Sequence, residues 1–111
     1  MGKTVSKLSP EANANCERLV KELSPFGDVT SKKMFGGYGV FESGVMLSLI
    51  TADGVVHLKA GDGNRERFEA AGAAKHGRMP CFQVPAEAWA DPDALREWAQ
   101  EAIEIAHAGK K

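Results

Sequence analysis

Residues 29–60 read VTSKKMFGGYGVFESGVMLSLITADGVVHLKA, and this stretch decides the fold. Runs rich in β-branched and aromatic residues alternate in it with short turns that contain glycine, a pattern typical of antiparallel strands joined by tight hairpins. We place strands at residues 29–35, 38–42, 45–50 and 55–60. Because strands with short connections usually pair with their neighbours in the chain, the stretch predicts an antiparallel meander.

Helices are predicted on both sides of this meander. Residues 9–11 (SPE) have the composition of a helix start, with a serine that can cap, a proline suited to the first turn and a glutamate near the positive end of the helix dipole. Apolar residues then recur at helical spacing as far as Leu23. Residues 91–93 (DPD) begin the last helix in the same way, and Leu95 and Trp98 fall on its expected buried face.

A short helix and a fifth strand are expected between the meander and the last helix. Asp62 is a candidate cap for a helix that runs through Phe68, and Gly72 suits the left-handed position beyond the end of that helix. Residues 79–84 have the composition of a strand. The prolines near the two ends of this strand favour a position at the edge of the sheet.

These elements are expected to form a single domain over residues 1–111, with residues 1–8 and 108–111 flexible. Their order along the chain is α-β-β-β-β-α-β-α. A sheet with one apolar face must bury that face against other elements. The expected fold class is therefore α+β, a two-layer sandwich in which helices lie on one face of an antiparallel sheet of about five strands.

The charge of the chain argues against an autonomous DNA-binding domain. Fourteen Lys and Arg residues stand against fifteen Asp and Glu residues, which gives a formal net charge of -1. Affinity for DNA comes largely from cationic contacts with phosphates and from the counterions that these contacts release. We therefore expect no strong direct binding to nucleic acid.

The cysteines and the apolar runs bear on the location of the protein. The two cysteines, Cys16 and Cys81, lie far apart in the chain, and no stretch resembles a secretory signal peptide. Reduced thiols and a cytoplasmic location are therefore expected. The longest apolar run, residues 45–50, is too short to cross a bilayer as a helix, so no membrane association is expected.

No strong motif for a cofactor, a metal or a catalytic centre is present. Residues 36–39 (GGYG) lack the lysine and spacing of a phosphate-binding loop and join two strands, which favours a hairpin or close backbone packing. The three histidines are scattered along the chain. An alternative stays open, namely a small ligand-binding domain or enzyme that uses the loop around Asp62 and Asn64 together with Cys81.

Nearly the whole chain resembles the N-terminal domain of the TfoX/Sxy competence regulators. Five segments carry the resemblance in the same order: residues 33–41 (KMFGGYGVF), 44–46 (GVM), 58–64 (LKAGDGN), 67–72 (RFEAAG) and 79–95 (MPCFQVPAEAWADPDAL). Within the last segment, Cys81-Phe82-Gln83 replaces the Tyr-Tyr-Glu expected in the family. The second, C-terminal domain of the full-length regulators is expected to be absent, because the sequence stops after the last predicted helix.

The resemblance implies a secretion-chaperone-like sandwich in an intracellular bacterial protein that takes part in transcription regulation. It implies no cofactor and no catalytic residues. The implied partner is a protein, either the cyclic-AMP receptor protein or RNA polymerase. A homodimer is also expected, from the family and from the edge strands that need to be covered.

Five exposed basic or aromatic residues are the candidates for contact with that protein partner. Basic and aromatic groups serve well as anchors of protein interfaces. Three of the candidates lie on the first predicted hairpin and two in the loop before the fifth strand: Lys32, Lys33, Tyr38, Lys75 and Arg78.

Overall fold

The structure is a computed structural model that describes residues 10–34, 36–75 and 80–109. A five-stranded sheet, a 3-10 turn and four helices follow one another along these residues. The elements are α1 (Pro10–Leu23), η1 (Ser24–Phe26), β1 (Val29–Met34), β2 (Gly37–Glu42), β3 (Val45–Ile50), β4 (Val56–Lys59), α2 (Arg65–Ala70), β5 (Cys81–Gln83), α3 (Ala86–Ala90) and α4 (Pro92–Gly109).

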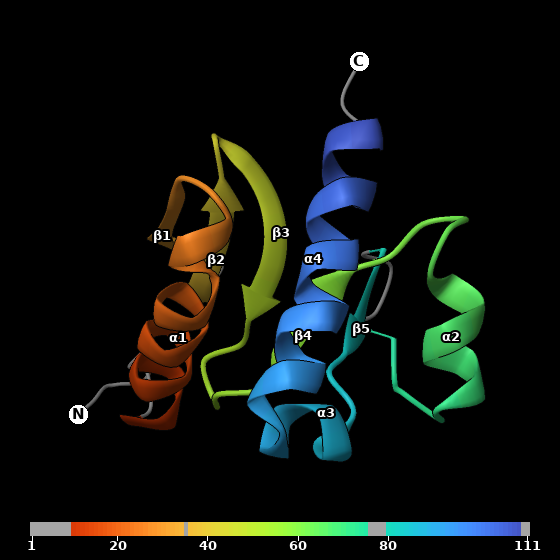
Figure 1. The fold of residues 1–111 in the computed structure, drawn as a ribbon. Coiled ribbons are helices and arrows are strands. Elements are labelled where there is room, and N and C mark those ends of the chain that lie inside the picture. The colour runs from red at the N-terminus through yellow and green to blue at the C-terminus, as the bar shows by residue number, and fades with distance from the viewer. Residues whose placement is uncertain (1–9, 35, 76–79, 110–111) are drawn as a thin grey trace.

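The sheet has the strand order β1-β2-β3-β4-β5, and every pair of neighbours is antiparallel. Figure 1 shows the two long helices, α1 and α4, on the same face of this sheet. The α+β class, the two-layer arrangement and the predicted order of the elements are confirmed. The strand of residues 45–50 has the predicted bounds, and the described bounds of the other strands differ from the predicted ones by two residues or fewer.

Glycines position the first two hairpins of the meander. Gly44 has φ 85° and Ser43 has φ 52°, as a two-residue hairpin with a primed turn requires. Gly36 has φ 76°, and a Cβ at Gly37 would overlap the carbonyl oxygen of Ile50 on the neighbouring strand. The glycines of residues 36–39 thus serve a turn and close backbone packing, as predicted from the sequence.

The core lies between the sheet and the two long helices. Helix α1 contacts β1 and β2, and α4 contacts β3 and β4. The ring of Phe68, from α2, stacks on Phe82, with centroids 5.3 Å apart, and lies 4.8 Å from the ring of Trp98. Leu95 and Trp98 are buried, as predicted for the last helix, and the other large buried residues include Leu19, Leu23, Leu47, Leu49 and Phe68.

The start of α2 differs from the prediction. Asp62 does not cap the helix, which instead begins at Arg65 directly after Asn64. The Asn64 side chain accepts a hydrogen bond from the backbone N–H of Gly61 (2.9 Å) and donates one to the carbonyl of Lys59 (3.1 Å). A carboxylate can only accept, so an amide closes this loop where Asp62 could not. Gly72 does take the expected left-handed conformation, with φ 75°.

Two short elements were not predicted. Helix α1 ends at Leu23, and residues 24–26 add the 3-10 turn η1. Residues 86–90 form the separate helix α3, so Trp89 belongs to α3 and not to the last helix. A five-residue helix is too short to display the apolar repeat by which helices are recognised.

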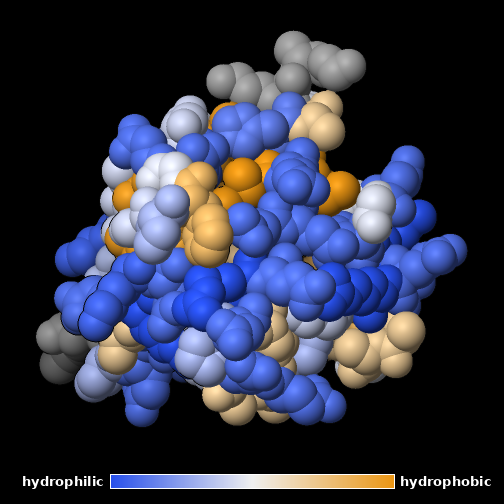
Figure 2. Space-filling model, viewed as in Figure 1, coloured by the Kyte–Doolittle hydropathy of each residue, from blue (hydrophilic) through white to orange (hydrophobic). Residues whose placement is uncertain are grey.

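The surface on the helix side of the molecule is mostly hydrophilic. Figure 2 shows the most hydrophobic residues of this side mainly in the upper half of the view, with paler hydrophobic residues along its lower edge. Among the described residues, Phe26 is the exposed large hydrophobic residue, at 42%. Within residues 10–34, 36–75 and 80–109, no helix combines the length and the apolar character that crossing a membrane requires.

Candidate functional site

The hairpin residues predicted as partner contacts lie near one another. Lys32 and Lys33 are exposed on β1, and Lys33 is paired in the sheet register with Tyr38 of β2. Tyr38 is half-buried, and its hydroxyl donates a 3.2 Å hydrogen bond to the Asn13 side chain on α1. Tyr38 therefore helps to attach α1 to the sheet, whereas the two lysines are available at the surface.

Lys75 lies apart from these hairpin residues. It is exposed and forms an isolated antiparallel bridge with Phe82 of β5. Because β1 and β5 are the two edge strands, Lys75 stands at the opposite edge of the sheet from Lys32 and Lys33. Arg78, the fifth predicted contact, lies outside the described residues. The structure does not bring Lys75 into one surface with the hairpin residues.

Two of the three residues named in the alternative hypothesis, Asn64 and Cys81, are buried. Asn64 is 2% exposed, and its amide is engaged by the backbone of its own loop. Cys81 is 1% exposed, and burial raises the pKa of its thiol, which disfavours the nucleophilic thiolate. Asp62 is exposed. The structure gives Asn64 a role in shaping the loop and Cys81 a role in packing.

Three hollows lie around the short helix α3. The first has a volume of about 330 Å³ and lies between α1, α3 and the β3–β4 turn. The second, also of about 330 Å³, lies beside β5. The third, of about 300 Å³, reaches the start of α4. Adjacent hollows share lining residues, Gln83 for the first two and Glu87 for the last two. The hollows therefore adjoin one another, and we call the surface that they make up the α3 surface.

The α3 surface is acidic. Four carboxylate side chains line it, and none of its described lining residues is Lys or Arg. A concave surface with charges of one sign concentrates its field and attracts the opposite charge. The four are Glu11, Asp53, Glu87 and Asp91.

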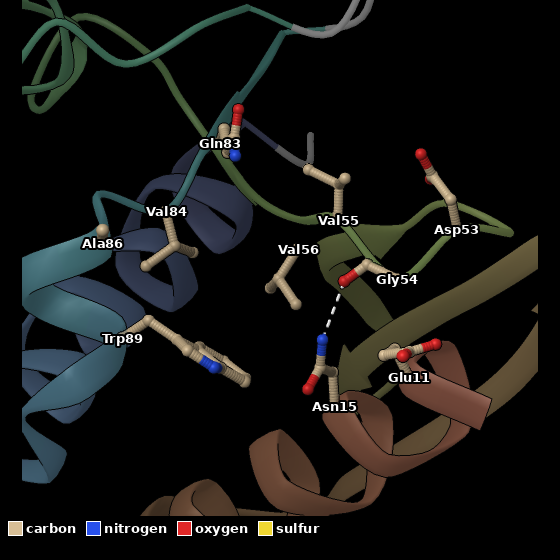
Figure 3. A pocket seen from close by; sticks show the side chains of 10 residues that line it. All are labelled: Glu11, Asn15, Asp53, Gly54, Val55, Val56, Gln83, Val84, Ala86 and Trp89. Carbon is tan, nitrogen blue, oxygen red and sulfur yellow. Dashed lines mark hydrogen bonds between the residues drawn. The ribbon is translucent and has the colours of Figure 1, made fainter. Parts of the chain in front are cut away.

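The first hollow is the most varied chemically, and we call it the Trp89 pocket. Figure 3 shows Trp89 on one side, Glu11 and Asp53 on the other, and Val56 between them. The Asn15 side chain on α1 donates a 2.8 Å hydrogen bond to the carbonyl of Gly54, which fixes the helix against the β3–β4 turn. Apolar, aromatic and charged side chains therefore line the same pocket.

Besides Glu11, two charged residues affect the electrostatics in and beside the Trp89 pocket. The hydroxyl of Thr51 donates to the carboxylate of Asp53 and, with backbone N–H groups, lowers the pKa of Asp53 below its ordinary value of 3.8. Asp53 is therefore ionised at neutral pH. On α1, the guanidinium of Arg18 lies 4.3 Å from the centroid of the Trp89 ring, in a cation–π contact. Arg18 does not line the pocket.

The sequence did not reveal this site, because its parts are far apart in the chain. Glu11 and Asn15 come from α1, Asp53 from the β3–β4 turn and Trp89 from α3. One local signal could have helped: Pro85 precedes α3 and Asp91 adopts an extended conformation before Pro92, so prolines bracket the helix on both sides. These two prolines would have predicted α3 but not the residues that face it.

Comparison with known families agrees with the sequence resemblance. A family model described as the TfoX N-terminal domain matches residues 21–106, well over half of the 111 residues. The matched range holds all five strands and the α3 helix. Among curated proteins, none matches the chain. The chain belongs to the TfoX N-terminal domain family, a family of regulators related to competence.

Proposed function

We propose that this domain is a non-enzymatic, cytoplasmic protein-interaction module that regulates transcription by contacting a protein partner through the α3 surface. The observation that carries the proposal is a concave surface with four carboxylates in a member of a regulatory family. Such a surface fits a basic segment of another protein, because complementary charges guide association and exclude wrong partners.

The state of the candidate nucleophiles supports a non-enzymatic role. Cys16 and Cys81 are both buried, and burial raises the pKa of each thiol. Within the described residues, no three His, Cys, Asp or Glu side chains are grouped so that they could hold a metal ion. The polar groups of the α3 surface are instead distributed over three adjoining hollows.

The charge of the domain supports a protein partner over DNA. A net charge of -1 gives little general attraction to phosphates, and the acidic α3 surface would repel them. Family membership suggests the cyclic-AMP receptor protein or RNA polymerase as the partner. Lys32 and Lys33 form a separate basic pair on β1, which is a second predicted contact.

The proposal is tested by fluorescence anisotropy with a labelled duplex that carries a recognition site for the cyclic-AMP receptor protein. At physiological salt, the domain alone should bind this duplex only weakly, and it should bind the complex of duplex, receptor and cyclic AMP more tightly. A duplex of scrambled sequence serves as the control. Tight, sequence-specific binding by the domain alone would overturn the proposal.

A charge reversal locates the contact. Glu87→Lys changes an exposed residue of α3 that lines two of the hollows, and it should weaken binding to the receptor complex by about tenfold or more. Glu104→Lys makes the same charge change on an exposed residue of α4 that lines none of the three hollows. Equal effects of the two variants would show that only net charge matters and that the α3 surface is not the contact.

A further inference from the structure

The outer edge of β1 carries backbone groups without a partner strand. Figure 1 shows β1 at one end of the sheet, and among the described residues no strand pairs with it beyond β2. The strand is six residues long, and its four central residues are exposed. An open edge of this kind is a template on which a strand from another chain can pair.

The register of β1 against β2 identifies the backbone groups that face outward. The N–H of Ser43 donates a 2.8 Å hydrogen bond to the carbonyl of Asp28, so these two residues, one step beyond the paired strands, form a hydrogen-bonded pair. In an antiparallel ladder, such pairs alternate with pairs that are not hydrogen-bonded. The residues of β1 whose N–H and carbonyl groups point away from β2 are therefore Val29, Ser31 and Lys33.

The rest of the described chain does not satisfy these outward groups. Within residues 10–34, 36–75 and 80–109, no loop or side chain forms a hydrogen bond with the backbone of Val29, Ser31 or Lys33. The other edge of the sheet differs, because the backbone N–H of Gln83 on β5 donates to the carbonyl of Ala74. A strand added at β1 would therefore gain a ladder of hydrogen bonds without displacing a described part of the chain.

The charge of the β1 edge selects the strand that pairs there. Lys32 and Lys33 are exposed, and neither belongs to an ion pair within the described residues. The other four residues of β1 are uncharged. Because successive side chains of a strand point to opposite faces, each face of the edge carries one lysine. Opposite charges on paired strands stabilise the pairing, and like charges oppose it.

We propose that β1 binds an extended acidic segment of a protein partner, which adds to the sheet as an antiparallel strand with two adjacent carboxylates opposite Lys32 and Lys33. In such strand addition, backbone hydrogen bonds supply affinity and side chains supply specificity. A second copy of β1 offers the same backbone groups but adds two lysines to the two already present, so the acidic strand is the better occupant. The inference deepens the second contact of the proposed function and rests on that function for the choice of a protein as partner.

The test is an NMR titration of the ¹⁵N-labelled domain with the peptide acetyl-Thr-Val-Glu-Glu-Val-Thr-amide, the Glu peptide. Binding should slow the exchange with solvent of the amide protons of Val29, Ser31 and Lys33. The amide protons of Thr30 and Lys32 already face β2 and should change little. This alternation distinguishes a paired strand from a purely electrostatic contact, which would protect no alternate set of amides.

Two control peptides separate the effect of charge from that of the backbone. Acetyl-Thr-Val-Gln-Gln-Val-Thr-amide, the Gln peptide, should bind about fivefold more weakly at low salt, because it lacks the opposite charges. This difference should shrink at about 1 M salt, where charges are screened within about 3 Å. Acetyl-Thr-Pro-Glu-Glu-Pro-Thr-amide keeps the charges but lacks a backbone donor on each of its two edges, so it should produce no alternating protection.

Paired variants locate the contact on β1. Lys32→Thr with Lys33→Thr should lower the affinity for the Glu peptide to that for the Gln peptide. Lys110→Thr with Lys111→Thr makes the same charge change at the end of the chain and should leave the difference between the two peptides unchanged. Backbone amide dispersion checks that each variant is folded. Light scattering on the same samples follows the mass, and the Glu peptide should dissociate any dimer that forms through this edge.

The assignment is overturned by a Glu peptide that binds no better than the Gln peptide, by protection that does not alternate along β1, or by equal effects of the two double variants. These measurements contain no receptor, so they are independent of the α3 surface. If the Glu peptide protects the alternate amides while the domain ignores the receptor complex, the inference holds and the proposed function fails. If Glu87→Lys weakens receptor binding as expected but the Glu peptide does not bind, the inference fails and the proposed function stands.

Discussion

A single carboxylate joins three separate parts of the chain. The side chain of Glu42, at the end of β2, is 13% exposed. It accepts hydrogen bonds from the hydroxyl of Ser43 (2.7 Å), the backbone N–H of Asp28 (3.2 Å) and Nε2 of His107 on α4 (2.6 Å). A Cβ at Gly27 would overlap this carboxylate, so a side chain there would require the Glu42 side chain to move.

These contacts predict a pH dependence of stability. The hydrogen bond from Ser43, followed by that from His107, lowers the pKa of Glu42 below its ordinary value of 4.5. In the unfolded chain the group keeps its proton to a higher pH, so the unfolded state binds more protons between the two pKa values. The stabilisation from Glu42 is therefore present above the ordinary pKa of 4.5 and is lost as the pH falls through the lowered pKa of the folded state.

The measurement is urea unfolding of the wild type and Glu42→Gln at several pH values between about 3 and 7. The wild type should lose more stability than the variant as the pH falls, and the two curves should converge at the acid end. Glu104→Gln, an exposed change on the same helix as His107, should follow the wild-type curve. Parallel curves for wild type and Glu42→Gln would show that Glu42 contributes nothing to the loss of stability at low pH.

At the scale of elements, the β2–β3 hairpin depends on one glycine. Gly44 has φ 85° and no heavy atom within 4 Å of its Cβ position, so a side chain there is opposed by backbone strain alone. Gly44→Ala should cost about 1–2 kcal/mol in the free energy of unfolding, the usual penalty for a left-handed non-glycine residue. Chemical denaturation at neutral pH measures the change.

Gly109→Ala is the matched control for this turn. Gly109 ends α4, also has open space at its Cβ position, and does not have a positive φ. The control should be neutral or slightly stabilising, because alanine is the better helix former. A cost for Gly44→Ala no larger than that for Gly109→Ala would contradict the role given to the primed turn.

The elements that could be predicted are those whose signal is local. The hairpin glycines, the prolines at the starts of α1 and α4 and the apolar repeats each specify a structure within a few residues. The sequence could not show that Asn64, and not Asp62, precedes α2 and bonds the loop backbone, because both polar side chains could reach the same backbone groups. The Trp89 pocket could not be predicted either, since α1, the β3–β4 turn and α3 meet only in the folded protein.

At the scale of the whole molecule, the two edges of the sheet differ in whether other backbone covers them. The outer side of β5 is covered, because the backbone N–H of Gln83 donates a 2.8 Å hydrogen bond to the carbonyl of Ala74 and Lys75 bridges to Phe82. Beyond β1, no further strand pairs within the described part of the chain. The open edge is therefore β1, six residues long and exposed over most of its length.

An open edge strand invites pairing with another chain, so we expect a homodimer in which two β1 strands pair antiparallel about a two-fold axis. Lys32 and Lys33 from both copies would then lie within a few residues of one another, and like charges across strands oppose pairing. The dimer should therefore be weak at low ionic strength and stronger at about 1 M salt, where charges are screened within about 3 Å. Replacement of both lysines by threonine should strengthen it at low salt, whereas Ser31→Pro, which removes a backbone donor and fixes φ, should weaken it.

Light scattering over the micromolar range measures the mass of the particle, and Lys110→Thr with Lys111→Thr provides a control of equal charge change. A monomer under all of these conditions would show that the β1 edge stays unpaired, and a dimer that the lysine and proline variants leave unchanged would place the contact elsewhere.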